Sequence, residues 1–308
     1  MKKLRYFSLI ALMLLASVPF AASQNVLVNS TKKYNNIKQI EVESGWLDVS
    51  YQGGEETEVS VEAYLESNIT DQDIVFVTLG DVLKVSYKRS GEKYNWNGKN
   101  KGYLKIKGPK SMQVSVKGSS GEINLTNLAS ETTVLQLTSG TVAAAQFKGN
   151  LKLTSTSGTL KVTGIEGNVE ARLTSGNAYL ENVNGGVYYE STSGSLDAKN
   201  IDGELNVRLT SGHAKIENAK QLGQLYFTSG NMRAVNSGLG PNTQFSGTSG
   251  NFTVQTASDL KSFNYSLKAT SGNIRVGNSS SGRTLELNNN ASTWIKGNIT
   301  SGNITIEN

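Results

Sequence analysis

A short glycine-centred repeat runs through the middle of the sequence and limits what the chain can fold into. The tripeptide Thr-Ser-Gly recurs there every 18 residues, and its glycines are Gly140, Gly158, Gly176, Gly194, Gly212 and Gly230. A second glycine column lies midway between the first, at Gly149, Gly167, Gly185 and Gly203. The unit therefore has nine residues, and two units make one period. A unit this short cannot bury a core by itself, so the repeats must stack on one another.

Apolar residues alternate within each repeat and mark the side of the chain that faces the core. After each Thr-Ser-Gly the second and fourth residues are apolar, as in Leu160 and Val162. The other half of the period supplies a second alternating set, for example Val187 and Tyr189. Side chains of a strand point alternately to its two faces, so these residues face inward. The sequence predicts an all-β, single-stranded parallel β-solenoid, or β-helix, of 18-residue coils with two short strands per coil.

The rest of the chain divides into three predicted parts. Residues 1–23 combine a basic start, an apolar stretch and small residues before an expected cleavage after Ser23, which is typical of a secretory signal peptide. Residues 24–119 form a β-rich N-terminal region, which is either a divergent start of the solenoid or a separate β module. The solenoid repeats are predicted over 120–308, with regular coils at 137–233 and longer coils at 234–308.

Composition limits where the protein can be located and which binding partners are expected. The chain of 308 residues has no cysteine, so neither a disulfide nor a lipoprotein anchor is expected. Cleavage of the signal removes three basic residues from a net charge of +5, so the charge gives little support for a nucleic-acid partner. No transmembrane segment is expected in the mature chain. Assuming a bacterial source, we predict an exported protein that is periplasmic, secreted or at the cell surface.

One loop combines aromatic, basic and glycine residues and is the candidate ligand contact. It spans residues 90–102 and reads SGEKYNWNGKNKG. Aromatic rings beside cationic side chains can stack on a sugar ring or hold an anionic polymer. The alternative is a long hairpin tip whose aromatic rings fold back onto the sheet. The candidate contacts are Lys93, Tyr94, Trp96, Lys99 and Lys101.

No residue set in the sequence matches a known kind of metal or catalytic site. The turns carry no aspartate column of the type that binds calcium, and His213 has no second imidazole or thiol with which to bind zinc. The nearest approach to a sugar-cleaving site is Asp197, which shares a column of the repeat with Tyr179 and Lys215. We therefore expect no enzyme, no metal and no cofactor.

Several features occur together in a recognisable order. A secretory signal and a β-rich lead come first, followed by the segment from Tyr103 to Pro109, the segment from Val114 to Val116, and then serial Ser-Gly-x-apolar-x-apolar units. From Ile37 to Asn308 this order resembles the bacterial putative-adhesin family. The resemblance implies an exported β-solenoid domain of otherwise unknown function at the cell envelope, with no catalytic residues to transfer.

Three functions are compatible with these observations. The leading hypothesis is an exported, non-catalytic envelope β-solenoid that acts as an adhesin or binding scaffold for an envelope polysaccharide or protein. The first alternative is a polysaccharide-degrading β-helix enzyme centred near Asp197. The second is a structural or stress-linked envelope protein that has no ligand. The oligomeric state does not follow from the sequence.

Overall fold

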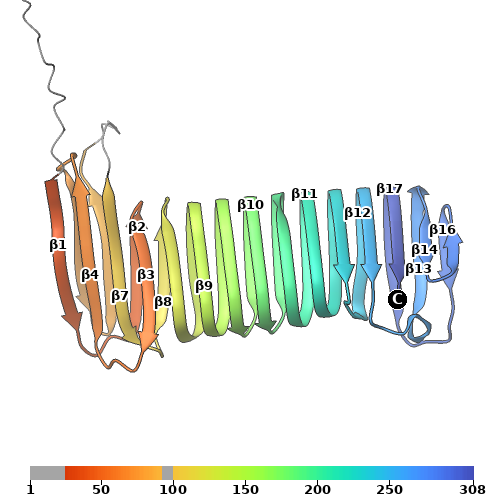
Figure 1. The fold of residues 1–308 in the computed structure, drawn as a ribbon, viewed down its shortest axis with the longest axis horizontal. Helices are drawn as coiled ribbons and strands as arrows, with labels where there is room; N and C mark the ends of the chain where they lie inside the picture. Colours follow the sequence, from red (N-terminus) through yellow and green to blue (C-terminus); the bar gives the residue numbers. More distant parts are fainter. Residues whose placement is uncertain (1–24, 92–99) are drawn as a thin grey trace, which may run out of the picture.

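The computed structural model describes residues 25–91 and 100–308, which form an elongated all-β stack (Figure 1). Within these ranges there is no α-helix, and the one helical turn is the 3-10 segment η1 (Leu260–Ser262). The strands run across the long axis of the molecule and follow one another along it (Figure 1). The all-β prediction is confirmed, and the architecture fits a β-solenoid.

The strands form three groups along the chain. The N-terminal group contains β1 (Asn25–Tyr34), β2 (Gln39–Gly45), β3 (Asp48–Gly54), β4 (Val59–Ser67), β5 (Gln72–Leu79), β6 (Val82–Arg89), β7 (Lys101–Pro109) and β8 (Gln113–Gly118). The middle group contains β9 (Glu122–Glu166), β10 (Val169–Asn184), β11 (Val187–Val235) and β12 (Leu239–Gln255). The C-terminal group contains β13 (Asn264–Ser271), β14 (Ile274–Val276), β15 (Ser279–Ser281), β16 (Thr284–Leu287) and β17 (Trp294–Glu307).

The middle strands coil continuously, and successive turns pair in parallel. Val169 of β10 pairs with Leu151 of β9 on one side and with Val187 of β11 on the other, so ladder neighbours here are 18 residues apart. The inward positions predicted from the alternation are confirmed, because the apolar residues of both half-periods are buried throughout these coils. Period-2 alternation therefore identified the core correctly.

Each coil places one strand on either side of the core, which gives the stack two faces. Face A is the outer side of the strand that follows each Thr-Ser-Gly, at residues 159–163, 177–181, 195–199, 213–217 and 231–235. Face B is the outer side of the other strand, at residues 151–155, 169–173, 187–191 and 205–209. One cluster of buried apolar residues lies between them. This cluster continues into the N-terminal region, where β3 and β8 pair with β9. The domain boundary near residue 119 stays a prediction.

Asparagines 18 residues apart form a ladder at one corner of the coils. Asn182, Asn200, Asn218 and Asn236 all have positive φ, between 49° and 56°, which asparagine tolerates better than most residues. The side-chain amide of each donates to the side-chain oxygen of the one before, at 2.8 Å, 2.9 Å and 2.8 Å. This ladder joins four successive corners and satisfies polar groups that the turns would otherwise leave to solvent.

The parallel pairing expected for the solenoid does not hold at its C-terminal end, and the sheet is mixed at both ends of the stack. At the N-terminal end β1 pairs with β4, β4 with β7, and β5 with β6, all antiparallel. At the C-terminal end β13 pairs with β16 and β14 with β15 in the same way. The reason is local: β5 and β6 are joined by the two-residue turn of Gly80 and Asp81, and a connection this short permits only an antiparallel pair.

The strand order at the two ends also departs from the sequence order. β17 lies between β12 on one side and β13 and β14 on the other. Gly302 therefore stacks between Gly250 and Gly272, although it follows both in the sequence. Near the N-terminus, β2 lies between β6 and β8, and β3 between β7 and β9. The strands of residues 234–308, predicted as longer coils, therefore do not stack in sequence order.

The insertion between β16 and β17 closes the C-terminal end around one buried asparagine. Asn264, which is 2% exposed, donates to the backbone oxygen of Ala291 at 2.6 Å. Its side-chain oxygen accepts from the backbone nitrogens of Asn289 at 2.8 Å and Ala291 at 3.2 Å. The amide of Asn289 in turn donates to the backbone oxygen of Phe263 at 2.7 Å. The asparagine tract of this insertion thus acts as a cap.

Replacing Asn264 by alanine is expected to lower the free energy of unfolding by about 1–3 kcal/mol, because three backbone groups of the cap lose their partner in a buried site. Urea unfolding of the mature chain measures the change. The control is Asn288→Ala, since exposed Asn288 accepts one bond, from the backbone nitrogen of Asn290. Equal effects of the two substitutions would show that Asn264 does not organise the cap.

Candidate functional site

The loop proposed as a ligand contact lies mostly outside the described residues. Lys93, Tyr94, Trp96 and Lys99 fall in the range 92–99, so their role stays a prediction. Lys101 is exposed at the start of β7, with its Nζ 5.7 Å from the centroid of the Tyr64 ring. Tyr64 stacks on Tyr103 of the neighbouring strand, with centroids 5.4 Å apart and 17° between the ring planes. Lys101 thus belongs to an aromatic and basic patch on β4 and β7.

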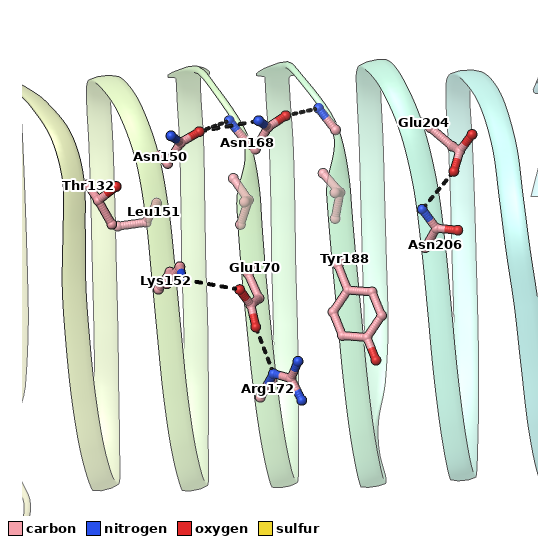
Figure 2. A pocket seen from close by; sticks show the side chains of 13 residues that line it. Thr132, Asn150, Leu151, Lys152, Asn168, Glu170, Arg172, Tyr188, Glu204 and Asn206 are labelled. Carbon is pink, nitrogen blue, oxygen red and sulfur yellow. Dashed lines mark hydrogen bonds and ion pairs between the residues drawn. The ribbon is translucent and has the colours of Figure 1, made fainter.

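A hollow of about 670 Å³ on face B is built from the corners and outer side chains of successive coils (Figure 2). Asn150, Asn168 and Gly186 line its corner. The amide of Asn168 donates to the side-chain oxygen of Asn150 at 3.2 Å, and the side-chain oxygen of Asn168 accepts from the backbone nitrogen of Gly186 at 2.8 Å. Lys152 and Arg172 lie on either side of Glu170 further along the strands (Figure 2).

Most of the charged side chains in and beside this hollow pair with one another, and Glu204 accepts hydrogen bonds from neutral amides instead. Arg172 donates from Nε to Glu170 at 2.8 Å and from Nη1 to Glu190 at 2.8 Å. Glu190 also lies 3.9 Å from Arg208 and accepts from the Tyr188 hydroxyl at 3.1 Å. The carboxylate of Glu190 thus stands between two guanidinium groups of the coils on either side. Exposed pairs of this kind each contribute less than about 1 kcal/mol, but their regular spacing supports the stacking of the coils.

The protonation states on face B follow from these contacts. The hydrogen bond to Glu170 is the main cause of the raised pKa of Arg172. Partial burial, followed by the hydrogen bond to Glu190, raises the pKa of the Tyr188 hydroxyl. Both shifts favour the forms that the two groups already have near neutral pH. Arg172 and Tyr188 therefore offer neither a base nor an ionised nucleophile, and their geometry is that of a structural network.

Face A carries three shallow hollows that lie end to end along the stack. The first has a volume of about 630 Å³ and is lined by the short outward side chains of Ala143 and Ala145 beside Lys161 and Tyr179. The second, of about 410 Å³, begins at Tyr179 and ends at Asn231 and Arg233. The third, of about 1050 Å³, begins at those two residues and extends to the C-terminal coils. Because neighbouring hollows share residues, they form one shallow groove, the face A groove.

The groove changes in character along its length. Tyr179, which is 47% exposed, is the one large apolar or aromatic side chain of the described middle coils with so high an exposure. Arg233 and Arg275 occupy the far part, and the Arg275 guanidinium pairs with Glu307. Between and beside them lies a row of amides from successive strands: Asn231, Asn251, Asn303 and Asn273. The groove thus offers an aromatic ring at one end and amide and guanidinium donors at the other.

The column considered as a sugar-cleaving site lies within this groove. Asp197 pairs with Tyr179 in the ladder and lines the second hollow together with Lys215 and His213. Lys215 lies 2.7 Å from Glu217, and this hydrogen bond and charge, followed by the charge of Asp197, raise the pKa of Lys215. A lysine that acts as a base must lose its proton near neutral pH, whereas these contacts favour the protonated form. The geometry suits binding better than proton abstraction.

The described residues also bear on metal sites and membrane spans. In residues 25–91 and 100–308 no three or more His, Asp or Glu side chains come together in a way that could hold a metal ion. In the same ranges no helix is long and apolar enough to cross a membrane.

The sequence placed Tyr179, Asp197 and Lys215 in one column but missed the groove around them. The signal that could have revealed the groove is the run of alanines at Ala143–Ala145. The outward side chains of Ala143 and Ala145 lie beside the long side chains of the following coils, Lys161 and Tyr179, and leave the surface lower there. A column alignment shows which residues are neighbours, but a comparison of side-chain lengths between columns is needed to see a hollow.

Solved structures of similar overall length resemble the chain at low sequence identity. A putative cell adhesion protein from Clostridium sporogenes is 12% identical, with a TM-score of 0.25, over 91% of this chain and 99% of that one. A putative adhesin from Bacteroides fragilis is 11% identical, with a TM-score of 0.38, over 92% and 98%. A putative lipid binding protein from Parabacteroides distasonis is 15% identical, with a TM-score of 0.41, over 91% and 96%. At these values the structures carry no inference about function.

A family model covers almost all of the described chain. The model described as Toastrack DUF4097 matches residues 37–207 and again residues 203–307. No functionally curated protein matches the sequence. The two family matches include the regular coils and both ends of the stack, and they confirm the resemblance to the putative-adhesin family. The chain belongs to the Toastrack DUF4097 family.

Proposed function

We propose that the protein is an exported, non-catalytic envelope protein that binds an extended polysaccharide along face A. The observation that carries this proposal is the face A groove, in which three hollows run in line and share residues. A single deep cavity would instead suit a small molecule. The predicted signal peptide supports export, and the pairing of the charged side chains supports a binding role over a catalytic one.

The dimensions of the groove favour a polymer. Tyr179 and Arg233 lie three coils apart, which is roughly 14 Å at the usual spacing of paired strands. Three further strand steps, through Thr253 and Thr305, lead from Arg233 to Arg275. The contact surface is therefore roughly 29 Å long. A ligand that reaches from the tyrosine ring to the second arginine must contain several sugar units.

The chemistry of the groove favours a sugar chain over an apolar peptide. The exposed ring of Tyr179 can stack on the apolar side of a sugar ring. The amides, threonine hydroxyls and guanidinium groups further along can hydrogen-bond with sugar hydroxyl groups. An amide followed by a hydroxyl group occurs on two adjacent strands, as Asn251 with Thr253 and Asn303 with Thr305, and this spacing suits neighbouring units of a polymer.

We expect the double variant Tyr179→Ala/Arg233→Ala to lose at least about tenfold in affinity for an envelope polysaccharide, because it removes the stacking ring and a donor shared by two hollows. The mature chain 24–308 would be tested on a glycan array and then by titration with the polymer that it captures. The matched control is Arg208→Ala/Tyr226→Ala, which removes the same residue types from face B. This control is expected to bind as the wild type does.

A third variant, Tyr94→Ala/Trp96→Ala, tests the loop predicted from the sequence. If only this variant fails to bind, the ligand site is the 90–102 loop and not face A. If the wild-type chain captures no glycan and no envelope component, the binding function is wrong and a structural role in the envelope takes its place. Release of reducing ends from a captured polymer, lost in Asp197→Ala, would instead establish the enzyme alternative.

A further inference from the structure

Exposed apolar side chains gather at the N-terminal end of the stack. In the described residues five large hydrophobic or aromatic side chains are markedly exposed, and one of them is Tyr179 of face A. The other four lie on the terminal strands: Val26 on β1, and Val75, Val77 and Leu79 on β5. The three residues of β5 alternate along one strand and are 37%, 43% and 57% exposed. They form an apolar strip, the β5 strip, on the outer surface of the layer that continues face B through β8, β2 and β6.

β5 is an edge strand with one side open. Among the described residues it pairs with β6 and with no other strand. Its inward residues Ile74 and Phe76 pack on the core, so both faces of this strand are apolar. The edge that faces away from β6 presents backbone N–H and C=O groups over a strand of eight residues. An apolar strand with an open edge is a template for another strand.

The other terminal strands carry features that hinder such pairing. β1 has Lys32 and Lys33 and a shift of register between Val26 and Val28. β15 has three residues, and β16 has four with a glutamate among them. Edge strands are commonly protected by lysines, bulges and shortness. β5 has eight residues, no lysine, no proline and no break in its register with β6. Its open edge is therefore the exception among the described strands.

Two stretches of the predicted mature chain lie outside the described ranges near β5, and the first of them is Gln24 alone. The range 92–99 joins Gly91 to Asn100 and contains eight residues. Running the length of β5 and returning would take about 16 residues, since a strand advances roughly 3.3 Å per residue. The last strand, β17, is held between β12 and the pair of β13 and β14 at the far end of the stack. We therefore look for the occupant in another molecule.

We propose that a second copy of this chain pairs with β5, antiparallel and about a two-fold axis, to form an end-to-end dimer. Asp73 is the single charged residue of β5 and lies near one end of it. A parallel pair would place the two Asp73 side chains side by side, whereas an antiparallel pair separates them and brings the two apolar strips together. The outer side chains of β5 then stay on one side of a continuous sheet.

This arrangement has a consequence for the molecule but does not rest on its ligand. A two-fold axis perpendicular to the joined sheet leaves face A of both copies on the same side, in one line. Two grooves on one support raise the effective concentration of the second site for a polymer that spans both. The dimer and the polysaccharide function can each be tested without the other.

The first test is the mass of the mature chain in solution, by light scattering and sedimentation over a wide range of concentration. The wild type is expected to have twice the monomer mass, and Val77→Lys the monomer mass, because a lysine at the centre of the edge opposes pairing. Val26→Lys is the control, since Val26 is 55% exposed at the same end but lies on β1. A monomeric wild type, or equal loss of the dimer in both variants, would overturn the proposal.

A second test uses the absence of cysteine from the chain, so that one introduced thiol is unique. Val75→Cys, Val77→Cys and Leu79→Cys are each oxidised under mild conditions. A disulfide requires Cα atoms closer than about 7 Å, so the variant whose residue lies on the axis should link into a dimer, or, where an inward residue such as Phe76 lies on the axis, a mixture of two of the variants should link. Tyr179→Cys should remain monomeric. Failure of all three variants and of their pairwise mixtures, or equally rapid linking of Tyr179→Cys, would contradict the β5 interface.

Discussion

Val207→Asp is expected to lower the free energy of unfolding by at least about 4 kcal/mol at neutral pH. Val207 is 1% exposed, and the inward residues on either side of it on β11, Leu205 and Leu209, are completely buried. A carboxylate placed there would lose its hydration on folding, and no cation or hydrogen-bond donor would compensate for that loss. Urea unfolding of the mature chain measures the loss. An effect this large is possible at one position because each coil supports both of its neighbours.

The pH dependence of the loss distinguishes a buried charge from a lost contact. The folded state would hold the new carboxyl group in its neutral form, so its pKa would be raised above the value of about 3.9 in the unfolded chain. The unfolded state then binds fewer protons above that pH, and stability falls as the pH rises, by up to about 1.4 kcal/mol per unit. The deficit should therefore shrink as the pH is lowered toward 4.

Two controls separate the alternatives. Val207→Ser removes apolar volume without adding a charge, so its smaller loss should not vary with pH over this range. Thr210→Asp places the same carboxylate on an exposed position of the same strand and should change stability by no more than about 0.5 kcal/mol. If Thr210→Asp and Val207→Asp were equally harmful, the assignment of inward and outward positions in β11 would be wrong.

The core of the coils could be predicted from the sequence because two periods act together. Alternation in twos decides which side chains face inward, and the 18-residue repeat decides which residues lie above one another. The burial of Leu160, Val162 and Tyr189 follows from these two facts alone. The asparagine ladder follows in the same way, since residues in one column of the repeat become neighbours in space.

The ends of the stack could not be predicted in this way, because their strands do not repeat. Thr-Ser-Gly occurs at Gly250, Gly272 and Gly302, but the motif does not state which copy stacks on which. The structure inserts the last copy between the other two. The cap around Asn264 likewise joins segments more than 20 residues apart, which no repeat predicts. The antiparallel pair of β5 and β6 is easier to predict from the sequence, since the turn at Gly80 indicates a hairpin.

The candidate site, like the fold, could be predicted from the sequence only in part. The column of Tyr179, Asp197 and Lys215 could be read from the repeat, but the groove around it depends on relative side-chain size across several columns. The pairing of Lys215 with Glu217, which argues against a base, also needed the positions of both side chains. The aligned positions of the repeat thus predict which residues are neighbours, but they do not predict where the surface is hollowed.

Gly212→Ala is expected to be more harmful than alanine at a glycine of an open turn, with a loss of at least about 3 kcal/mol in the free energy of unfolding. Gly212 has a φ of +131°, which side chains rarely adopt, and a Cβ atom there would lie 1.9 Å from the backbone oxygen of Gly194 in the previous coil. The oxygen belongs to the ladder, so it cannot move without shifting its whole coil. Relief of the clash must therefore break hydrogen bonds on at least one side.

Two other glycines separate the strain of the backbone from the clash. Gly80 has a φ of +61°, and a Cβ atom there would meet nothing within 4 Å, so Gly80→Ala should cost about 1–2 kcal/mol from conformation alone. Gly282 has open space and no such φ, so Gly282→Ala should be close to neutral. Urea unfolding of the three variants, with amide hydrogen exchange to locate the opened coils, gives the ranking. If Gly212→Ala cost no more than Gly80→Ala, the glycine column would serve the turn only, and the close contact between coils that explains the strict repeat of Thr-Ser-Gly would have to be abandoned.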